Sequence, residues 1–220
     1  MTPPVAVAFD VMETLISLEG LGPRLADVGL SPDAVHALFP RTLLYGLGMS
    51  VVGDYIPFPV AAAEALRTIS RGTLTEDQIA HVMAGFAELP AHPDVAGCMK
   101  TLAEGGVRMI CLTNGSAAIT RGFLDRHGLS DYIESIVVCS EVNTWKPPAV
   151  VYHHGCERLG LTPSQVALVA VHAWDCHGAK KAGMMSGWAA RLEGRFGEIF
   201  LPADVMGADL VEVAEGLLAL

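Results

Sequence analysis

The sequence predicts an α/β protein: a parallel sheet with a helical insertion after its first strand. Short apolar runs bounded by proline, glycine or charge alternate with segments of helical periodicity, which is the pattern of right-handed βαβ units. The first two apolar runs are separated by a long stretch that carries only helical signals. Polar residues follow the apolar runs, so they are expected at the carboxyl ends of the strands.

The first strand is predicted at residues 5–9, an uninterrupted apolar run between Pro4 and Asp10. Such a run suits a strand buried on both faces in the middle of a parallel sheet. Asp10 then lies at the carboxyl end of the strand, where open α/β sheets bind ligands, and is a candidate nucleophile, base or metal ligand. The alternative is that Asp10 only caps a turn that follows the strand.

Residues 17–89 are predicted to form the helical insertion. Ser31-Pro32-Asp33 is typical of a helix start, and apolar residues recur at helical spacing from Val35 to Leu43. Thr75-Glu76-Asp77-Gln78 has the pattern of a capping box. The predicted division is therefore a core of residues 1–16 and 90–220 with a helical domain of residues 17–89.

After Pro90 and Pro93 the alternation of strands and helices returns. Further strands are predicted at 107–112, 133–138, 166–171 and 187–190, with a short edge strand and a final helix within 203–220. The polar residues that follow strands are Asp10, Thr113, Asn114, Lys146, His172 and Asp175. Because parallel strands share one carboxyl edge, these side chains are expected to converge there. Taken singly, each has a structural alternative: a helix cap, a solvated lysine or a core histidine.

Composition narrows the functional classes. The formal net charge of −10 opposes general binding of nucleic acid or of an anionic membrane, so an anionic substrate needs local cations. No membrane-crossing apolar span or signal-peptide pattern is present, and a cytoplasmic protein is expected. The five cysteines are widely spaced without a C-x-x-C pair, which indicates reduced thiols rather than disulfides or a zinc site.

The motifs together resemble the haloacid dehalogenase superfamily, and within it the 2-haloacid dehalogenase (type II) group, over nearly the whole chain. The four family motifs correspond to Asp10 with Thr14-Leu15, to Leu112-Thr113-Asn114-Gly115-Ser116, to Lys146-Pro147 with Tyr152 following, and to Ala173-Trp174-Asp175. Arg41 falls on the position of the cap arginine that this group uses. The resemblance implies a Rossmann-like core with an α-helical cap, and a homodimer.

Two departures from the superfamily pattern favour carbon–halogen chemistry over phosphoryl transfer. A phosphatase of this superfamily carries a second aspartate, a proton donor, where Met12 stands, and an acidic magnesium ligand where Val171 stands. Asp10 and Asp175 alone are a poor magnesium cage, so no metal and no other cofactor is expected. Glu13 is one residue away from the position of the missing aspartate, so its side chain would point in a different direction and is not expected to replace it. Halide leaves carbon without a proton, so displacement needs no general acid.

The resemblance thus implies metal-independent hydrolysis of small 2-halocarboxylic acids to 2-hydroxy acids through an ester on Asp10. It implies that Arg41 and Asn114 bind the halide. Thr14, Thr113 and Lys146 would hold the nucleophile and the substrate carboxylate, and Tyr152 would support Lys146. His172 with Asp175 would position or activate the hydrolytic water, and Met12 and Trp174 would shape the pocket.

The chain also departs from the better-known dehalogenase branch, which has tyrosine at the position of Met12 and serine and asparagine at those of Ala170 and His172. A neutral His172 could compensate by accepting a proton from water. Asp-x-x-Glu-Thr-Leu and His-Ala-Trp-Asp form a recurrent variant among sequences similar to this group. Two other hypotheses remain at this point: a phosphatase-like hydrolase of the same superfamily with a rewired site, and a degenerate member that only binds an anionic metabolite or a protein.

Overall fold

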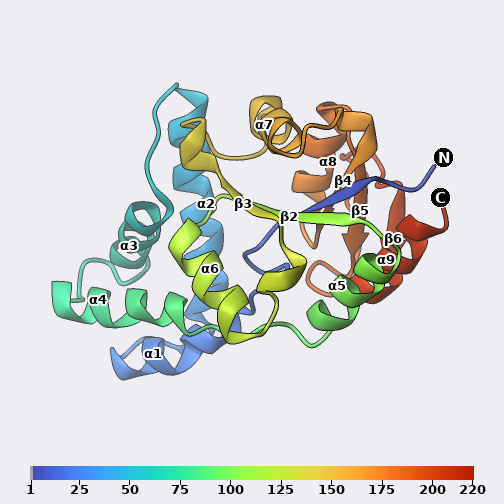
Figure 1. Cartoon of the computed structure of the whole chain (residues 1–220). Coiled ribbons are helices and arrows are strands. Elements are labelled where there is room, and N and C mark those ends of the chain that lie inside the picture. Colours follow the sequence, from blue (N-terminus) through green and yellow to red (C-terminus); the bar gives the residue numbers. More distant parts are fainter. Residues whose placement is uncertain (1) are drawn as a thin grey trace.

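The computed structural model describes residues 2–220 and confirms the predicted α/β fold. The strands within these residues form one parallel six-stranded sheet in the order β3-β2-β1-β4-β5-β6 (Figure 1). The strands are β1 (Ala6–Phe9), β2 (Arg108–Thr113), β3 (Ser135–Val138), β4 (Val166–Ala170), β5 (Met185–Ala189) and β6 (Val205–Gly207).

Strand β1 occupies the centre of the sheet, as its continuous apolar sequence predicts. All four of its residues are buried, and Val7 lies opposite Met109 of β2 and Ala167 of β4. The chain adds β2 and β3 on one side of β1 and then β4, β5 and β6 on the other side. The direction of winding therefore switches at β1, and the crevice at the carboxyl ends of β1 and β4 is the expected ligand site of such a sheet.

Helices cover both faces of the sheet. Alternate residues of β1 point to opposite faces: Val7 and Phe9 pack with α5, α6 and α9, whereas Ala6 and Ala8 pack with α7 and α8. These helices are α5 (Val95–Glu104), α6 (Ala117–Arg126), α7 (Ala149–Leu159), α8 (Ala173–Lys181) and α9 (Leu210–Leu218). The result is a three-layer α/β/α arrangement around two apolar cores.

The chain between β1 and α5 folds into helices that add no strand to the sheet and group to one side of it in Figure 1. They are α1 (Gly22–Asp27), α2 (Val35–Val51), α3 (Phe58–Ile69) and α4 (Glu76–Ala84). The predicted capping box opens α4, since Thr75 Oγ1 accepts from the Gln78 backbone N–H and the Thr75 N–H donates to Gln78 Oε1. The two ends of this segment lie side by side, because Ser17 N–H donates to Pro90 O at 2.9 Å.

Strand β5 begins at Met185, two residues before the predicted start at Gly187. Ser186 is fully buried and its backbone N–H donates to Asp204 Oδ2 at 2.8 Å. Pairing with β4 begins at Met185, so the strand includes this polar residue.

The five cysteines are all buried, and none forms a disulfide, which confirms the prediction of free thiols. Among residues 2–220, no helix combines the length and the hydropathy that crossing a bilayer requires.

Candidate active site

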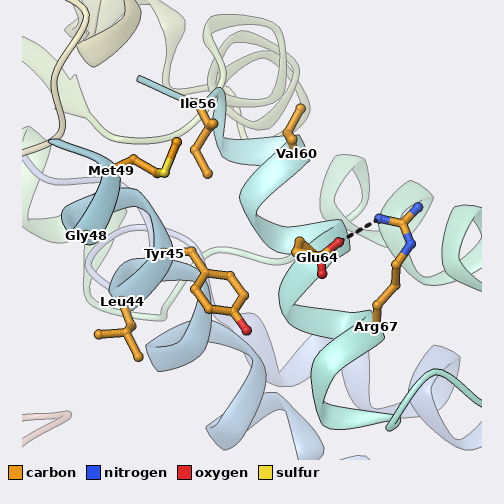
Figure 2. A pocket seen from close by; sticks show the side chains of 8 residues that line it. All are labelled: Leu44, Tyr45, Gly48, Met49, Ile56, Val60, Glu64 and Arg67. Atoms are coloured by element: carbon orange, nitrogen blue, oxygen red, sulfur yellow. Dashed lines mark hydrogen bonds and ion pairs between the residues drawn. The ribbon is translucent and has the colours of Figure 1, made fainter. Parts of the chain in front are cut away.

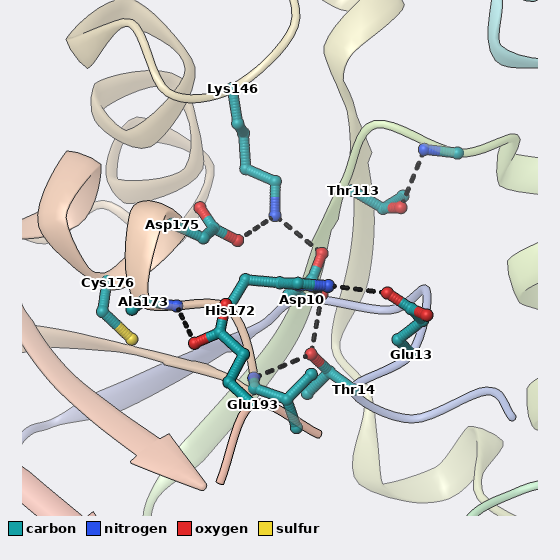
Figure 3. A network of polar contacts seen from close by, with 12 residues as sticks. Asp10, Glu13, Thr14, Thr113, Lys146, His172, Ala173, Asp175, Cys176 and Glu193 are labelled. Atoms are coloured by element: carbon teal, nitrogen blue, oxygen red, sulfur yellow. Dashed lines mark hydrogen bonds and ion pairs between the residues drawn. The ribbon is translucent and has the colours of Figure 1, made fainter. Parts of the chain in front are cut away.

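Asp10 follows β1 directly and lies at the carboxyl edge of the sheet, where it meets Thr14, Lys146 and His172 (Figure 3). Its backbone N–H donates to Val169 O of β4 at 3.0 Å, which fixes the start of the loop. Thr14 Oγ1 donates to Asp10 Oδ2 at 2.7 Å, and Thr14 Oγ1 in turn accepts from the Val171 N–H at 3.2 Å. The carboxylate is 5% exposed, so it is reachable but held from most sides.

Lys146 lies between the two predicted carboxylates. Its Nζ is 2.8 Å from Asp10 Oδ1 and 2.5 Å from Asp175 Oδ2, and its side chain is fully buried. Tyr152 donates to Asp175 Oδ1 at 2.6 Å, so it supports Lys146 through Asp175 rather than by direct contact. Asp175 sits in the first turn of α8, where a negative charge is stabilised by the helix dipole.

The charges around Asp10 keep it ionised. Burial alone would raise the pKa of Asp10, but Lys146 and His172 outweigh that effect and hold it well below its ordinary value. Burial would likewise lower the pKa of Lys146, and the two carboxylates instead raise it. Asp10 is therefore an unprotonated carboxylate beside a permanently charged ammonium, which is the state that a nucleophile needs.

His172 lies on the other side of Asp10 from Lys146. Its Nδ1 is 3.3 Å from Asp10 Oδ2, and its Nε2 is 2.9 Å from Glu13 Oε2. The partner of His172 is thus Glu13 and not Asp175, with which the sequence prediction had paired it. Within residues 2–220, the buried Nδ1 has no hydrogen-bond partner of good geometry, so its contact with Asp10 is mainly electrostatic.

The ionisation of His172 also differs from the prediction of a neutral imidazole. Burial would lower its pKa, but the close, negatively charged carboxylates of Asp10 and Glu13 prevail and raise the pKa of His172 to about 10. At neutral pH the ring is an imidazolium. Asp10 is consequently flanked by two cations, Lys146 and His172.

Glu13 is a further residue of the site, and the sequence did not predict its contact with His172. Its backbone has φ +63°, a left-handed conformation that costs a residue with a side chain about 1–2 kcal/mol. The turn brings the Glu13 carboxylate to His172, 159 positions away in the chain. One signal pointed to the pair: Glu13 and His172 belong to the same variant of the family motifs.

The second motif supports the site from the other edge. Asn114 Oδ1 accepts from the Lys146 backbone N–H at 2.8 Å and from Cys139 Sγ at 3.0 Å, so this oxygen positions the lysine segment. Thr113 Oγ1 accepts from the Gly115 N–H at 2.8 Å and so stabilises its own turn. Met12 is buried and lies against Gly115, where a Cβ would be 3.3 Å from Met12 Cε.

A pocket of about 360 Å³ opens beside His172, between α2 and the loops that follow the strands. The residues that line it are Glu13, His36, Phe39, Pro40, Leu43, His172, Trp174 and Leu192. The predicted pocket residue Trp174 is among them, with its ring centroid 5.5 Å from that of His172. The lining is mainly apolar, and its charged groups are those of the Glu13–His172 pair.

The structure does not bring Arg41 into this group. Arg41 is exposed on α2, and it is absent from the lining of the pocket although Pro40 beside it takes part. Its role as a halide ligand remains a prediction. In the described part of the chain, no group of three or more histidine, cysteine, aspartate or glutamate side chains is arranged to hold a metal ion.

A buried carboxylate clamped by a lysine at the switch point of a parallel sheet, below an inserted helical segment, defines a hydrolase of the haloacid dehalogenase fold. The chain belongs to the haloacid dehalogenase-like hydrolase family, whose model matches residues 5–183.

Relatives that cover most of the chain include dehalogenases. The chain is 31% identical over 183 residues to (S)-2-haloacid dehalogenase 4A of Burkholderia cepacia, covering 81% of this chain and 79% of that protein. It is 30% identical over 188 residues to (S)-2-haloacid dehalogenase 1 of Pseudomonas sp. (strain CBS-3), covering 83% of each. A crystal structure of a dehalogenase with an intermediate complex superposes with a TM-score of 0.88 at 26% identity, covering 97% of this chain and 96% of that one.

Proposed function

We propose that the protein hydrolyses small (S)-2-haloacids to 2-hydroxy acids, without a metal, through a covalent ester on Asp10. The observation that carries this proposal is the state of Asp10: an ionised carboxylate between two cations, with the thioether of Met12 where a phosphatase has its proton donor. A thioether has no proton to give, so the site suits a leaving group that departs as an anion.

In the first half-reaction, an Asp10 oxygen attacks C2 of the substrate. The new C–O bond forms as the carbon–halogen bond breaks, and the configuration at C2 inverts. Lys146 and Thr14 hold the carboxylate in place through hydrogen bonds of 2.8 and 2.7 Å. Because both halide and substrate carboxylate are negative, the Lys146 ammonium and the His172 imidazolium stabilise them as the bond breaks.

In the second half-reaction, water attacks the ester carbonyl carbon of Asp10 and releases the 2-hydroxy acid. Ester formation removes the negative charge on Asp10, one of the two charges that raise the pKa of His172. The imidazolium then releases its Nδ1 proton to solvent and can accept one from the attacking water, while Glu13 holds Nε2. The pair of Glu13 and His172, rather than His172 with Asp175, is the base of this step.

The remaining predicted site residues take supporting roles. Asn114 and Thr113 order the loops that carry Lys146 and the second motif. Trp174 lines the pocket beside His172, and Met12 packs against Gly115 of the second motif. Arg41 binds halide or substrate carboxylate only if its side chain moves from the outer surface of α2 toward Asp10 when substrate is bound.

Residues 17–89 act as a cap over the core of residues 1–16 and 90–220. Support comes from the two connections between this segment and the core, which lie side by side. The Ser17 N–H donates to Pro90 O, and the His92 N–H donates to Leu15 O at 3.0 Å. The pocket between α2 and the core is then the space where cap and core meet over the substrate. We place the protein in the cytoplasm, because five buried thiols without a disulfide suit a reducing compartment.

The cap also offers a surface for a homodimer. An open groove of about 570 Å³ between α2 and α3 is lined by apolar side chains, and Leu44 and Val60 are 56% and 53% exposed there (Figure 2). Glu64 and Arg67 lie at one edge of the groove, so each copy would carry both charges of a self-complementary contact.

The test is halide release from (S)-2-chloropropionate, with and without EDTA, beside phosphate release from an aryl phosphate with added Mg²⁺. We expect halide release that EDTA leaves unchanged, and no phosphate release. Magnesium-dependent phosphate release without halide release would assign the chain to the phosphatases of the superfamily. Absence of both products would favour a binding protein.

A further inference from the structure

We propose that Arg191, in the turn after β5, is a positioning residue for the water step: it holds the turn from which Glu13 reaches His172. This inference rests on the proposed function of the site and adds a residue that none of the family motifs contains. The segment that carries it lies far from Glu13 in sequence and meets it only in the fold.

The guanidinium of Arg191 bridges the nucleophile loop and the core. Nη2 donates to the Glu13 carbonyl at 3.1 Å and to the Thr14 carbonyl at 2.6 Å, while Nη1 pairs with Asp94. Asp94 itself accepts from the Leu210 N–H at 2.9 Å, at the start of α9. The Arg191 side chain is only 19% exposed, so its planar guanidinium group is held by protein partners on both sides.

The turn at Glu13 needs such a contact. Its positive φ is a strained conformation for a glutamate, and the carbonyls that Arg191 binds belong to this residue and the next. Two charge-assisted hydrogen bonds to consecutive carbonyls favour this one arrangement of the turn over relaxed alternatives. That arrangement is the one in which the Glu13 carboxylate lies 2.9 Å from His172 Nε2.

The same turn holds the other member of the pair. Glu193 Oε2 accepts from the backbone N–H of Ala173, the residue after His172, at 3.0 Å (Figure 3). The same oxygen accepts from Trp188 Nε1 at 3.2 Å. Residues 191–193 therefore bind the backbone of Glu13 and Thr14 on one side and that of Ala173, the residue after His172, on the other. Because both contacts are made to backbone atoms, the turn sets the distance between the pair without entering the chemistry.

The expected phenotype is specific to ester hydrolysis. Arg191→Met should lower kcat for (S)-2-chloropropionate about 10- to 100-fold, because small misplacements of catalytic groups have effects of this size, with KM changed by less than about twofold. In single-turnover experiments the Asp10 ester should accumulate, since its formation depends on Asp10, Lys146 and the Thr14 hydroxyl, and Arg191 contacts only the backbone carbonyl of Thr14. Arg191→Lys keeps the positive charge opposite Asp94 but lacks the planar guanidinium. It should also accumulate the ester, with a smaller loss of kcat.

The matched control is Arg108→Met. Arg108 also binds one carboxylate, Glu134, and one backbone carbonyl, Leu159 O, but it lies at the start of β2, at the opposite edge of the sheet. Its kcat should stay within about twofold of the wild type. Thermal unfolding of each variant establishes that the compared proteins are folded, and Arg191→Lys carries the test if Arg191→Met does not fold.

A second readout does not depend on turnover. Histidine ring resonances, with that of His172 assigned by its loss in His172→Asn, report the pKa of this imidazole by NMR. We expect it to move from about 10 toward 6.5 in the Arg191 variants, as Glu13 drifts away, and to stay unchanged in Arg108→Met. An unshifted resonance together with wild-type kcat, or equal changes in the control, would overturn the role of Arg191. If the wild type releases no halide, the proposed function and its water step fail together, and the titration then shows only whether Arg191 holds Glu13 beside His172.

Discussion

The two sides of Asp10 are built differently. On one side, Lys146, Asp175 and Tyr152 form a fully buried chain of ion pairs and hydrogen bonds with distances of 2.5–2.8 Å. On the other side, His172 lies 3.3 Å from Asp10 and pairs with Glu13 at the edge of a pocket. The first side is closed and the second faces the space where a ligand can enter.

This difference suggests a division of labour. A permanent, dehydrated ammonium suits the constant task of keeping Asp10 ionised and oriented. An imidazole next to a pocket suits a task that changes during the cycle, because its charge depends on whether Asp10 is a free carboxylate or an ester. The Lys146 side should therefore govern stability and ester formation, and the His172 side ester hydrolysis.

Removal of the proposed nucleophile, Asp10, should have the largest effect on turnover, because both half-reactions depend on it. Asp10→Asn should lower halide release by about 10⁴-fold or more, as loss of a covalent nucleophile does in other enzymes. Asp131→Asn, the same change at an exposed position, is the control and should leave turnover unchanged. Measurable halide release by Asp10→Asn at more than a hundredth of the wild-type rate would contradict the covalent mechanism.

Lys146→Met tests the closed side. It leaves the buried carboxylates of Asp10 and Asp175 without their cation, so the free energy of unfolding should fall by about 3–5 kcal/mol. Urea titration followed by circular dichroism measures the loss. A change below about 1 kcal/mol would mean that the Lys146 pair does not stabilise the fold as its burial indicates.

Glu13→Gln and His172→Asn test the open side. Each should slow ester hydrolysis about 100-fold, a usual contribution of general base catalysis. Ester formation should slow less, and more in His172→Asn, which removes a cation, than in Glu13→Gln. The double variant should be about as slow as either single variant, because the two residues act as one unit. Additive losses in rapid-quench measurements would show that Glu13 and His172 work independently.

The pH dependence of stability separates the two cations. The folded-state pKa of His172, about 10, lies above the ordinary value of 6.5, so its stabilising contribution is complete below pH 6.5 and is lost as pH rises toward 10. Over that range, stability of the wild type relative to His172→Asn should fall by at most about 1.4 kcal/mol per pH unit. A pH-independent difference between the two proteins would contradict a raised pKa.

The smallest effect on catalysis is expected from a substitution on the surface of the helical segment of residues 17–89. Leu44→Arg should convert the proposed homodimer to a monomer in light scattering, with kcat within about twofold of the wild type. Ile199→Arg is the control, since Ile199 is equally apolar and 86% exposed but lies on the core. A monomeric wild-type protein would refute the dimer and leave the account of Asp10 intact.

The sequence predicts the closed side well and the open side poorly. Asp10, Lys146 and Asp175 each follow a recognisable strand, and parallel topology alone brings them to one edge. The contact between Glu13 and His172 depends on a left-handed turn, and the spacing of residues does not indicate such a conformation at a glutamate. For Arg41, helical periodicity predicts α2 but not that this side chain is exposed on its outer surface.

The most direct test of the central claim is a single turnover of excess enzyme with (S)-2-chloropropionate in ¹⁸O-water, followed by mass spectrometry of the peptide that contains Asp10. If water cleaves an ester on Asp10, one ¹⁸O atom enters this carboxylate and the 2-hydroxy acid of the first turnover carries none. If water attacks the substrate directly, the label appears in the product and Asp10 stays unlabelled, which would contradict the account.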